Sequence, residues 1–399
     1  MKRILVLGGA GTMGLEVVQQ LVKRTSDRII VADASEKALK KVKAELGDRV
    51  EPEHVNIEDQ PTLAALMKAS HVVVNAAGPF YKTAARVVKA AIEARVNLVD
   101  IDDDFDATRD SLALDEEAKQ AGVTVIIGMG ASPGITNLIA KFGADKLDKV
   151  EDIRIYWAES AIDPTGPAAM SHWFHITSGK VPVYRNNKWT EVQGFTEPEE
   201  VDFISPIGKL NVVYTGHPEP LTLPRYIYGV KNVSIKGTLY PPKIMELYRT
   251  LIDTGCGSTD QFIIAENISM PLREYSVRLV RAMPRFAPGY FGEILHDSLD
   301  KYKSVAGAFK IDVAGKQAGE NVRYIYDVAA DSVTRSTATP AAMATLMLLE
   351  GKVTMTGVLA PEGALDASMF YAELASEART REIEIRERAF SKNFFRKRY

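Results

Sequence analysis

The stretch that decides the fold lies at residues 3–33 and reads RILVLGGAGTMGLEVVQQLVKRTSDRIIVAD. A short apolar run at residues 3–7 ends in glycines, which is typical of a buried parallel strand. Apolar residues then recur at helical spacing over residues 13–24, and a second apolar run at residues 28–32 ends at Asp33. This order predicts a strand, a glycine-rich turn, a helix and a second strand, which together form a βαβ unit.

Three glycines in the turn, Gly9, Gly11 and Gly14, form a G-x-G-x-x-G motif directly after the first strand. Gly9 permits a tight turn, Gly11 lets a pyrophosphate approach the backbone, and Gly14 lets the helix pack against the strand. The N–H groups at the helix start, around Thr12 and Met13, and the positive end of the helix dipole then attract phosphates. In this context the motif predicts a dinucleotide-binding site.

Asp33 ends the second strand about 20 residues after the motif, where dinucleotide-binding domains carry an acidic residue. Its carboxylate can accept hydrogen bonds from the hydroxyls of the adenosine ribose, and it would repel a phosphate on that ribose. No arginine follows Asp33 directly, since the next residues are Ala34 and Ser35. The sequence therefore favours NAD as the cofactor, with NADP as the alternative.

Strand and helix patterns continue to alternate as far as residue 127, which predicts an α/β fold with a doubly wound parallel sheet. After residue 150 the sequence becomes rich in Val, Ile and Tyr with alternating polarity, which predicts an α+β domain with an antiparallel or mixed sheet. We expect further strands at residues 53–57, 71–75, 97–100, 123–127, 152–160, 209–216, 232–240, 274–283, 307–315 and 321–329. We expect helices at residues 35–46, 62–69, 83–94, 112–121, 168–179, 242–253, 289–303 and 340–350.

The composition excludes several classes of protein. The chain has 399 residues and a formal net charge of -3, so nothing in the charge balance indicates a nucleic-acid partner. No apolar run reaches the length of a transmembrane helix, so we expect no membrane partner. A single cysteine, Cys256, cannot form a disulfide within the chain, and no signal-peptide pattern precedes the first strand. We therefore expect a cytoplasmic protein.

Two loops at the carboxyl edge of the predicted parallel sheet are candidate binding segments, because ligands of open α/β sheets bind at that edge. Ala77, Gly78, Pro79 and Phe80 follow the fourth strand, and their small residues would let the loop approach the nicotinamide ribose. The sequence equally allows a tight connecting loop without a binding role. The second loop follows the fifth strand and reads DIDDD over residues 100–104; Asp102 or Asp103 could hold a substrate ammonium, or the loop could be a solvated acidic turn.

The third candidate segment, residues 214–225, reads YTGHPEPLTLPR and concentrates His, Glu and Arg in a loop rich in proline. His217 could exchange protons near neutral pH, and Arg225 could bind a substrate carboxylate at two points. The alternative is that His217 only holds the loop in place. His172 and His175 lie three residues apart, but no third ligand has a recognisable spacing, so we expect packing or pocket lining there and no metal.

A third loop follows the sixth predicted strand and reads GASPG at residues 130–134. The motifs that end the first, fourth and sixth predicted strands, in this order, resemble those of the saccharopine dehydrogenase-like family. The resemblance extends to TPAAMA at residues 339–344 and GVLAPE at residues 357–362. It implies a discontinuous Rossmann domain, formed by residues 1–132 plus 337–399, with an inserted α+β substrate and dimerisation domain at residues 133–336. It also implies a homodimer. At Ser132 the sequence departs from saccharopine reductases, which tend to carry an acidic residue there.

The resemblance implies hydride transfer between a nicotinamide and a carbon that bears an amine, by way of an imine. The leading hypothesis is an NAD(P)-dependent oxidoreductase that acts on an amino acid, a diamine or an imine. A reductase of another carbonyl substrate is the second hypothesis. An NAD(H)-binding sensor without turnover is the third, although a sensor has no need of the His, Glu and Arg cluster at residues 214–225.

Overall fold

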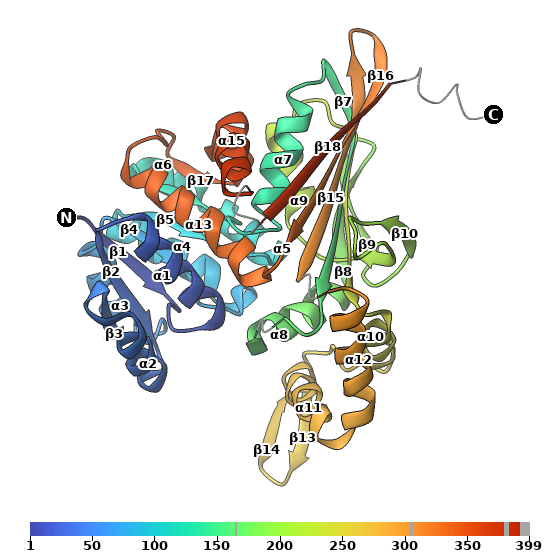
Figure 1. The fold of residues 1–399 in the computed structure, drawn as a ribbon. Helices are drawn as coiled ribbons and strands as arrows, with labels where there is room; N and C mark the ends of the chain where they lie inside the picture. Colours follow the sequence, from blue (N-terminus) through green and yellow to red (C-terminus); the bar gives the residue numbers. More distant parts are fainter. Residues whose placement is uncertain (164–165, 304–305, 379–382, 392–399) are drawn as a thin grey trace. The chain divides into compact units, whose positions relative to one another are not determined.

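A computed structural model describes residues 1–163, 166–303, 306–378 and 383–391. The chain forms two compact units (Figure 1). The first comprises Met1–Phe142, Leu221–Tyr226 and Thr334–Glu373, and the second Gly143–Pro220, Ile227–Val333 and Leu374–Tyr399, of which residues 392–399 lie outside the described ones. The sequence interpretation had placed residues 374–399 with the first unit and residues 221–226 with the second.

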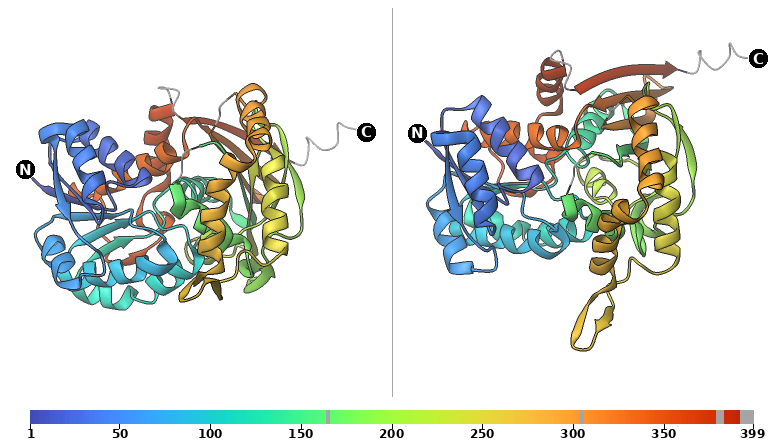
Figure 2. Two further views of the ribbon diagram at one scale, coloured as in Figure 1. Left: turned by 90° about the horizontal axis from the view of Figure 1, so that it is seen from below. Right: turned by 60° about the horizontal axis from the view of Figure 1, so that its bottom comes forward.

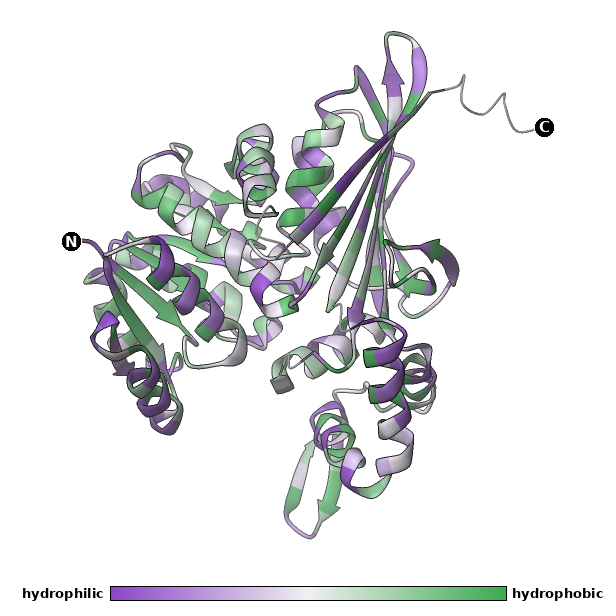
Figure 3. Ribbon diagram, viewed as in Figure 1, coloured by the Kyte–Doolittle hydropathy of each residue, from purple (hydrophilic) through white to green (hydrophobic). Residues whose placement is uncertain are grey.

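The first unit contains a seven-stranded sheet in which all paired strands run parallel, in the order β17-β6-β5-β4-β1-β2-β3. This order confirms the doubly wound Rossmann fold predicted from the sequence. Figure 3 shows that the central strands of this sheet are hydrophobic, as strands covered on both faces must be. The strands are β1 (Arg3–Leu7), β2 (Arg28–Asp33), β3 (Val50–His54), β4 (Val72–Asn75), β5 (Asn97–Asp100), β6 (Thr124–Ile126) and β17 (Gly357–Leu359).

Helices cover both faces of this sheet, and apolar residues of α3 and α4 complete a core with β1, β4, β5 and β6 (Figure 2). The helices between β1 and β5 each return the chain to the start of the next parallel strand, as a doubly wound sheet requires. The helices are α1 (Thr12–Arg24), α2 (Glu36–Leu46), α3 (Gln60–Lys68), α4 (Phe80–Ala94), α5 (Phe105–Leu112), α6 (Asp115–Ala121), α7 (Ile135–Ala144), α13 (Val333–Leu349), α14 (Pro361–Ala364) and α15 (Ala367–Ala378).

The second unit contains a nine-stranded mixed sheet in which β7 lies between β12 and β15. β12 pairs with β7 in parallel, whereas β15, β16 and β18 continue the sheet antiparallel. A mixed sheet was expected here, although the strand at the chain's end was not. The strands are β7 (Lys149–Ser160), β8 (Lys180–Arg185), β9 (Lys188–Gln193), β10 (Glu199–Asp202), β11 (Lys209–Tyr214), β12 (Asn232–Tyr240), β15 (Gly307–Gln317), β16 (Glu320–Ala330) and β18 (Ile383–Ser391).

The remaining elements of the second unit are helical, except for the hairpin of β13 (Gln261–Ala265) and β14 (Ile268–Pro271). The helices are α8 (Gly166–Thr177), α9 (Glu219–Tyr226, which continues into the first unit), α10 (Pro242–Asp253), α11 (Leu272–Phe286) and α12 (Pro288–Asp300). None of the helices in the described part of the chain combines the length and apolarity that a membrane span requires.

Two local predictions were wrong. Residues 274–283 were expected to form a strand, but they belong to α11, whose buried residues are Arg273, Ser276, Val277 and Val280. These buried residues are three or four positions apart, as in a helix. A short sequence with alternating polarity does not exclude such a helix. The third strand was expected at residues 53–57 and lies at Val50–His54, because this edge strand buries little beyond Val50 and so shows no apolar pattern.

Candidate functional site

The glycine turn after β1 is packed too closely to accept side chains. Gly8 has φ +67°, a backbone conformation that favours glycine, and a β-carbon there would lie 2.6 Å from the carbonyl oxygen of Ala76. A β-carbon on Gly14 would lie 2.1 Å from the carbonyl oxygen of Gly8, and one on Gly9 would lie 2.9 Å from Val31 Cγ1. The turn thus presses against β2, α1 and the loop after β4. Gly8 was not among the residues predicted for the site. Its position directly after the first strand is the sequence feature that could have indicated it.

α1 begins at Thr12 with Gly11 as its N-cap, and no side chain caps the helix. The first turn contains no acidic residue, and its N–H groups have no carbonyl one turn earlier to bond. Around Gly11 a β-carbon would meet only the carbonyl oxygen of Gly8, at 3.2 Å. Backbone donors without side chains in front of them, at the positive end of a helix, suit a pyrophosphate. The residues therefore fit the dinucleotide that the motif predicts.

Asp33 lies at the end of β2, beside the glycine turn. Its Oδ2 accepts a hydrogen bond from the N–H of Ala10 at 3.2 Å, and its Oδ1 accepts one from the N–H of Ser35 at 2.9 Å. A carboxylate oxygen has capacity for a further hydrogen bond, so Asp33 can still accept from ribose hydroxyls. The two backbone donors fix the position of this carboxylate relative to the turn.

The loop after β4 is tied to the glycine turn and to its own strand end. Asn75 is fully buried; its side-chain oxygen accepts from the N–H of Ala77 at 3.1 Å, and its amide donates to Asp100 Oδ2 at 2.8 Å. Thr83 Oγ1 donates to the carbonyl oxygen of Ala77 at 2.6 Å. Pro79 is the N-cap of α4, which begins at Phe80. Together with the close approach of Ala76 to Gly8, these hydrogen bonds hold the loop in place beside the glycine turn.

Three aspartates of the DIDDD segment form a buried ladder rather than a solvated turn. Asp100 Oδ1 accepts from the N–H of Asp102, and Asp102 Oδ1 accepts from the N–H of Asp104, each at 2.9 Å. Thr108 Oγ1 donates to Asp102 Oδ2 at 3.0 Å, and the N–H of Tyr81 donates to Asp104 Oδ2 at 2.9 Å. All three carboxyl groups are almost fully buried. Both carboxylate oxygens of Asp102 therefore accept hydrogen bonds that hold the loop in its conformation.

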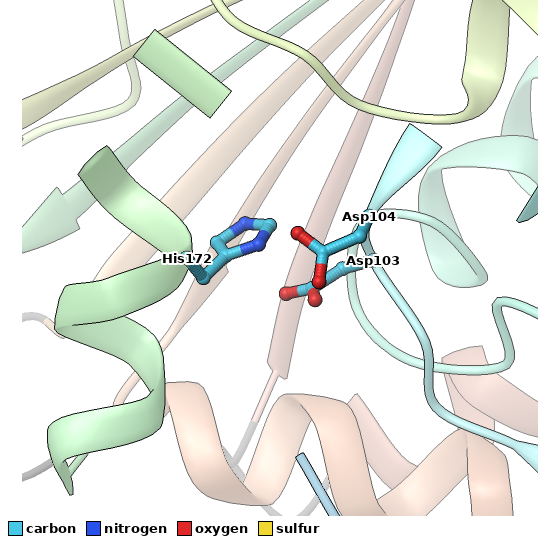
Figure 4. A group of neighbouring side chains, drawn as sticks. All are labelled: Asp103, Asp104 and His172. Atoms are coloured by element: carbon cyan, nitrogen blue, oxygen red, sulfur yellow. The ribbon is translucent and has the colours of Figure 1, made fainter. Parts of the chain in front are cut away.

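Burial changes the ionisation of this ladder. It raises the pKa of Asp100 to about 7, although the hydrogen bond from Asn75 opposes the shift. Burial, together with the charges of Asp100 and Asp104, raises the pKa of Asp102 well above its ordinary value. Asp103, in contrast, is only half-buried, and Figure 4 shows it beside Asp104 on the loop after β5. Of the two predicted ammonium partners, Asp103 is the more accessible.

A buried polar hub joins three distant parts of the first unit. Asn137, on α7, donates through Nδ2 to Thr222 Oγ1 at 3.1 Å and to Glu362 Oε2 at 3.0 Å, and its Oδ1 accepts from the N–H of Gly134. Burial raises the pKa of Glu362. The hub holds the segment Leu221–Tyr226, which carries Arg225. The Arg225 side chain is exposed, and its Nε donates to the carbonyl oxygen of Leu221 at 3.3 Å.

The second unit buries His217 in a cluster of aromatic and acidic side chains. His217 Nδ1 lies 3.9 Å from Glu219 Oε2, and Glu219 is completely buried. His172, which projects from α8 in Figure 4, meets His217 edge to face with 5.3 Å between ring centroids. Trp157 of β7 lies 5.4 Å from the same ring and donates through Nε1 to Thr215 Oγ1 at 3.3 Å. A buried imidazole beside a carboxylate is a suitable group for proton transfer.

The two histidines of HWFH have different partners, although α8 is helical as predicted. His172 meets His217, whereas His175 Nδ1 lies 2.8 Å from Nη1 of Arg273, a buried residue of α11. The sequence did not single out His172 as a neighbour of His217, because the two are 45 residues apart and only the second unit's tertiary structure joins them.

Comparisons with known proteins match both the cofactor segment and the whole chain. Residues 4–126 match the family model described as the saccharopine dehydrogenase NADP binding domain. The chain is 22% identical over 386 residues to carboxynorspermidine synthase of Vibrio cholerae serotype O1, covering 88% of this chain and 89% of that protein. Apo saccharopine dehydrogenase (L-Glu forming) from Saccharomyces cerevisiae has a TM-score of 0.68 at 16% identity, covering 98% of this chain and 100% of that one.

The comparisons confirm the α/β fold with a second mixed sheet. They also confirm NAD(P) as the class of cofactor, because the matched domain is described by its NADP binding. The preference for NAD over NADP stays a prediction from Asp33.

Proposed function

We propose, on the premise that the chain belongs to the saccharopine dehydrogenase-like family, that it is an NAD(P)-dependent dehydrogenase or reductase acting on a carbon–nitrogen bond. The substrate is an amino acid, a diamine or an imine. The observation that carries the proposal is the glycine turn, with Gly14 closed against Gly8 and Asp33 fixed beside it. The names of the two relatives, carboxynorspermidine synthase and saccharopine dehydrogenase (L-Glu forming), support a substrate that has both amine and carboxyl groups.

The first unit serves the cofactor in this proposal. Its N–H groups at Thr12 and Met13 hold the pyrophosphate, Asp33 accepts from the adenosine ribose, and residues 77–80 form the wall beside the nicotinamide ribose. The nicotinamide supplies a hydride or accepts one when it is bound. We retain residues 1–132 and 337–373 as the dinucleotide-binding part of the chain. In this proposal the nine-stranded sheet of the second unit contributes to substrate binding and to the contact between two copies of the chain in a homodimer.

His217 is the proposed acid–base group, because oxidation of an amine must release a proton and imine reduction must supply one. The carboxyl group of Glu219 stands 3.9 Å from His217 Nδ1, so the imidazole has an acidic neighbour in the buried cluster. Arg225 binds a substrate carboxylate, and its exposed guanidinium bonds only through Nε among the described residues. Asp103 holds the substrate ammonium, while Asp102 keeps the loop in shape.

The test is a substrate scan with the purified full chain. Lysine, saccharopine, ornithine and diamines are each offered with NAD and with NADP, and the reduced-nicotinamide absorbance is followed. Turnover with one amine would support the proposal. Saturable binding of NAD(H) without turnover of any amine or imine would contradict it, and would favour a sensor or a reductase of another carbonyl compound.

A further inference from the structure

We propose that one surface of the second unit binds an anionic lipid membrane. The surface consists of the hairpin of β13 and β14 together with α11, and we call it the hairpin–α11 surface. Figure 1 shows the hairpin projecting beside α11, and the right-hand view of Figure 2 shows its turn standing clear of the other elements of this unit. Phe262 packs on Tyr275 with 5.1 Å between the ring centroids, which joins the hairpin to the helix. The inference goes beyond the proposed function and does not depend on it.

The hairpin exposes apolar side chains on both of its faces. All five residues of β13 are exposed, and three of them in succession are Phe262, Ile263 and Ile264. Because successive residues of a strand point to opposite faces, these three reach both faces of the hairpin. Ile263 is 76% exposed and Ile268, in β14, is 54% exposed. This apolar area is in contact with water, and an apolar phase outside the chain can cover it.

α11 adds positive charge and further apolar area to the same surface. Arg278, Arg281 and Arg285 are exposed and lie three or four positions apart, so they share one face of the helix. Leu279 and Phe286, the latter 82% exposed, border this face. Within the described residues none of the three guanidinium groups has a hydrogen-bond or ion-pair partner. Arginine side chains of this kind hold their charge at the level of lipid headgroups while apolar neighbours enter the acyl chains.

The charge of the surface indicates which occupant it fits. Its acidic residues are Glu266, in the turn of the hairpin, and the half-buried Glu274, and the three exposed arginines outnumber them. A second copy of the chain would bring the same arginines together across a two-fold axis, where they would repel each other. A nucleic acid offers phosphates but no apolar phase for Ile263 and Phe286. An anionic bilayer offers both phosphate groups and hydrocarbon, and the contact requires no spanning helix.

The experiment measures sedimentation of the purified full chain with lipid vesicles. The vesicles contain phosphatidylcholine alone or an equal mixture of phosphatidylcholine and phosphatidylglycerol. One variant combines Arg278→Gln, Arg281→Gln and Arg285→Gln, which removes the charge and preserves helical propensity. Ile263→Gln and Phe286→Gln each remove an exposed apolar side chain. Urea unfolding of every variant, which should keep the wild-type midpoint, shows that the substitutions leave the fold intact.

Two matched controls change the same kinds of residue elsewhere. The first combines Lys37→Gln, Lys40→Gln and Lys41→Gln, three exposed basic residues of α2 in the first unit. The second is Met355→Gln, which replaces an exposed apolar residue of the first unit. The controls separate binding through the hairpin–α11 surface from a response to overall charge or overall apolarity.

We expect the wild type to sediment with the mixed vesicles and not with phosphatidylcholine alone, and to be released by high salt, which screens the charges. The loss of three arginines should lower the partition coefficient about a hundredfold. Each apolar substitution should lower it about tenfold. In the variant Ile263→Trp, brominated acyl chains should quench the added fluorescence, which reports insertion of this position.

A wild type that does not bind the mixed vesicles would overturn the inference. Equal losses in the arginine variant and the α2 control would also overturn it, because binding would then follow overall charge. Binding of polyglutamate in place of vesicles would assign the surface to an acidic protein. A smaller oligomer in Ile263→Gln with unchanged vesicle binding would assign it to a second copy. None of these outcomes concerns turnover, so the substrate scan tests the proposed function separately.

Discussion

The carbonyl oxygen of Gly8 lies 2.1 Å from the place where a β-carbon on Gly14 would stand. The N–H of Gly11 donates to the same oxygen at 3.0 Å. This carbonyl group therefore closes the glycine turn and also packs against the start of α1. Gly14 is therefore required by the packing of the helix against the turn. Any larger residue has to move the helix start, which carries the proposed phosphate donors.

Gly14→Ala is expected to destabilise the chain by about 1–3 kcal/mol and to weaken NAD(P)H binding at least about tenfold. Urea unfolding and fluorescence titration measure the two effects. Gly292→Ala is the control, because Gly292 lies within α12 with no atom near the added β-carbon. An unchanged affinity in Gly14→Ala would show that the turn does not hold the cofactor.

His217→Asn is expected to lower kcat by about 10²–10⁴-fold, as the loss of a general acid–base group does. The dissociation constants of NADH and NADPH should stay the same. The measurement is steady-state turnover with the substrate found in the scan, over the pH range in which the wild type is stable. His296→Gln is the control, because His296 is an exposed residue of α12. A kcat within threefold of the wild type would exclude His217 as the proton-transfer group.

Arg225→Lys tests the carboxylate anchor. Lysine keeps the charge but cannot bind a carboxylate with two parallel hydrogen bonds, so KM for a carboxyl-bearing substrate should rise about tenfold. Because the side chain is exposed, the free energy of unfolding should change by less than about 0.5 kcal/mol. An equal rise of KM for a diamine without a carboxyl group would argue against this role.

Asp100 should make stability fall as the pH rises. Its pKa is raised from 3.8 to about 7 by burial, so between these values the folded chain holds a proton that the unfolded chain has lost. This contribution is fully present below the lower value and is lost as the pH passes the higher one. Asp100→Asn should reduce the slope of the unfolding free energy by up to about 1.4 kcal/mol per pH unit in that window.

Urea unfolding at pH values from 4 to 8 measures that slope. Asp110→Asn is the matched control, since Asp110 is an exposed residue of α5. The control should keep the wild-type slope. A slope in Asp100→Asn that equals the wild-type slope would show that the carboxyl group is ionised in the folded chain across the window.

The hub around Asn137 offers a contrast between two substitutions. Glu362→Gln keeps a carbonyl oxygen for the amide of Asn137 and, because burial already disfavours the charge, should cost less than about 1 kcal/mol. Asn137→Leu leaves the buried partners Gly134, Thr222 and Glu362 without their bonds and should cost about 3 kcal/mol or more. Equal costs for both variants, measured by urea unfolding, would contradict this description.

The cofactor part of the chain could be predicted from the sequence because each of its signals is local. Gly9, Gly11, Gly14 and Asp33 lie within one βαβ unit, where spacing along the chain fixes position in space. The hub at Asn137 could not be predicted in this way. Its partners lie 85 and 225 residues further along the chain, and no local pattern announces a hydrogen bond over that separation.

The aspartate segment shows the same limit within a few residues. The sequence of this segment is compatible with a solvated acidic loop or with a binding site for an ammonium group. Neither interpretation predicts that three of its carboxyl groups are buried. Burial there depends on how Asn75, Tyr81 and Thr108 close over the loop from other elements. Only that closure separates Asp102, which is fully buried, from Asp103, which is not.

The sequence by itself thus determined the doubly wound fold, the tightly packed glycine turn and the class of cofactor, because periodicity and glycine spacing act between neighbouring residues. The tertiary structure decided which polar side chains are buried, which of them meet, and that His217 stands beside Glu219, His172 and Trp157. It also added β18 to the second sheet, through pairing with β16 about 60 residues earlier in the chain. The physical reason is that burial and long-range contacts depend on the packing of whole elements, and a sequence pattern describes only one element at a time.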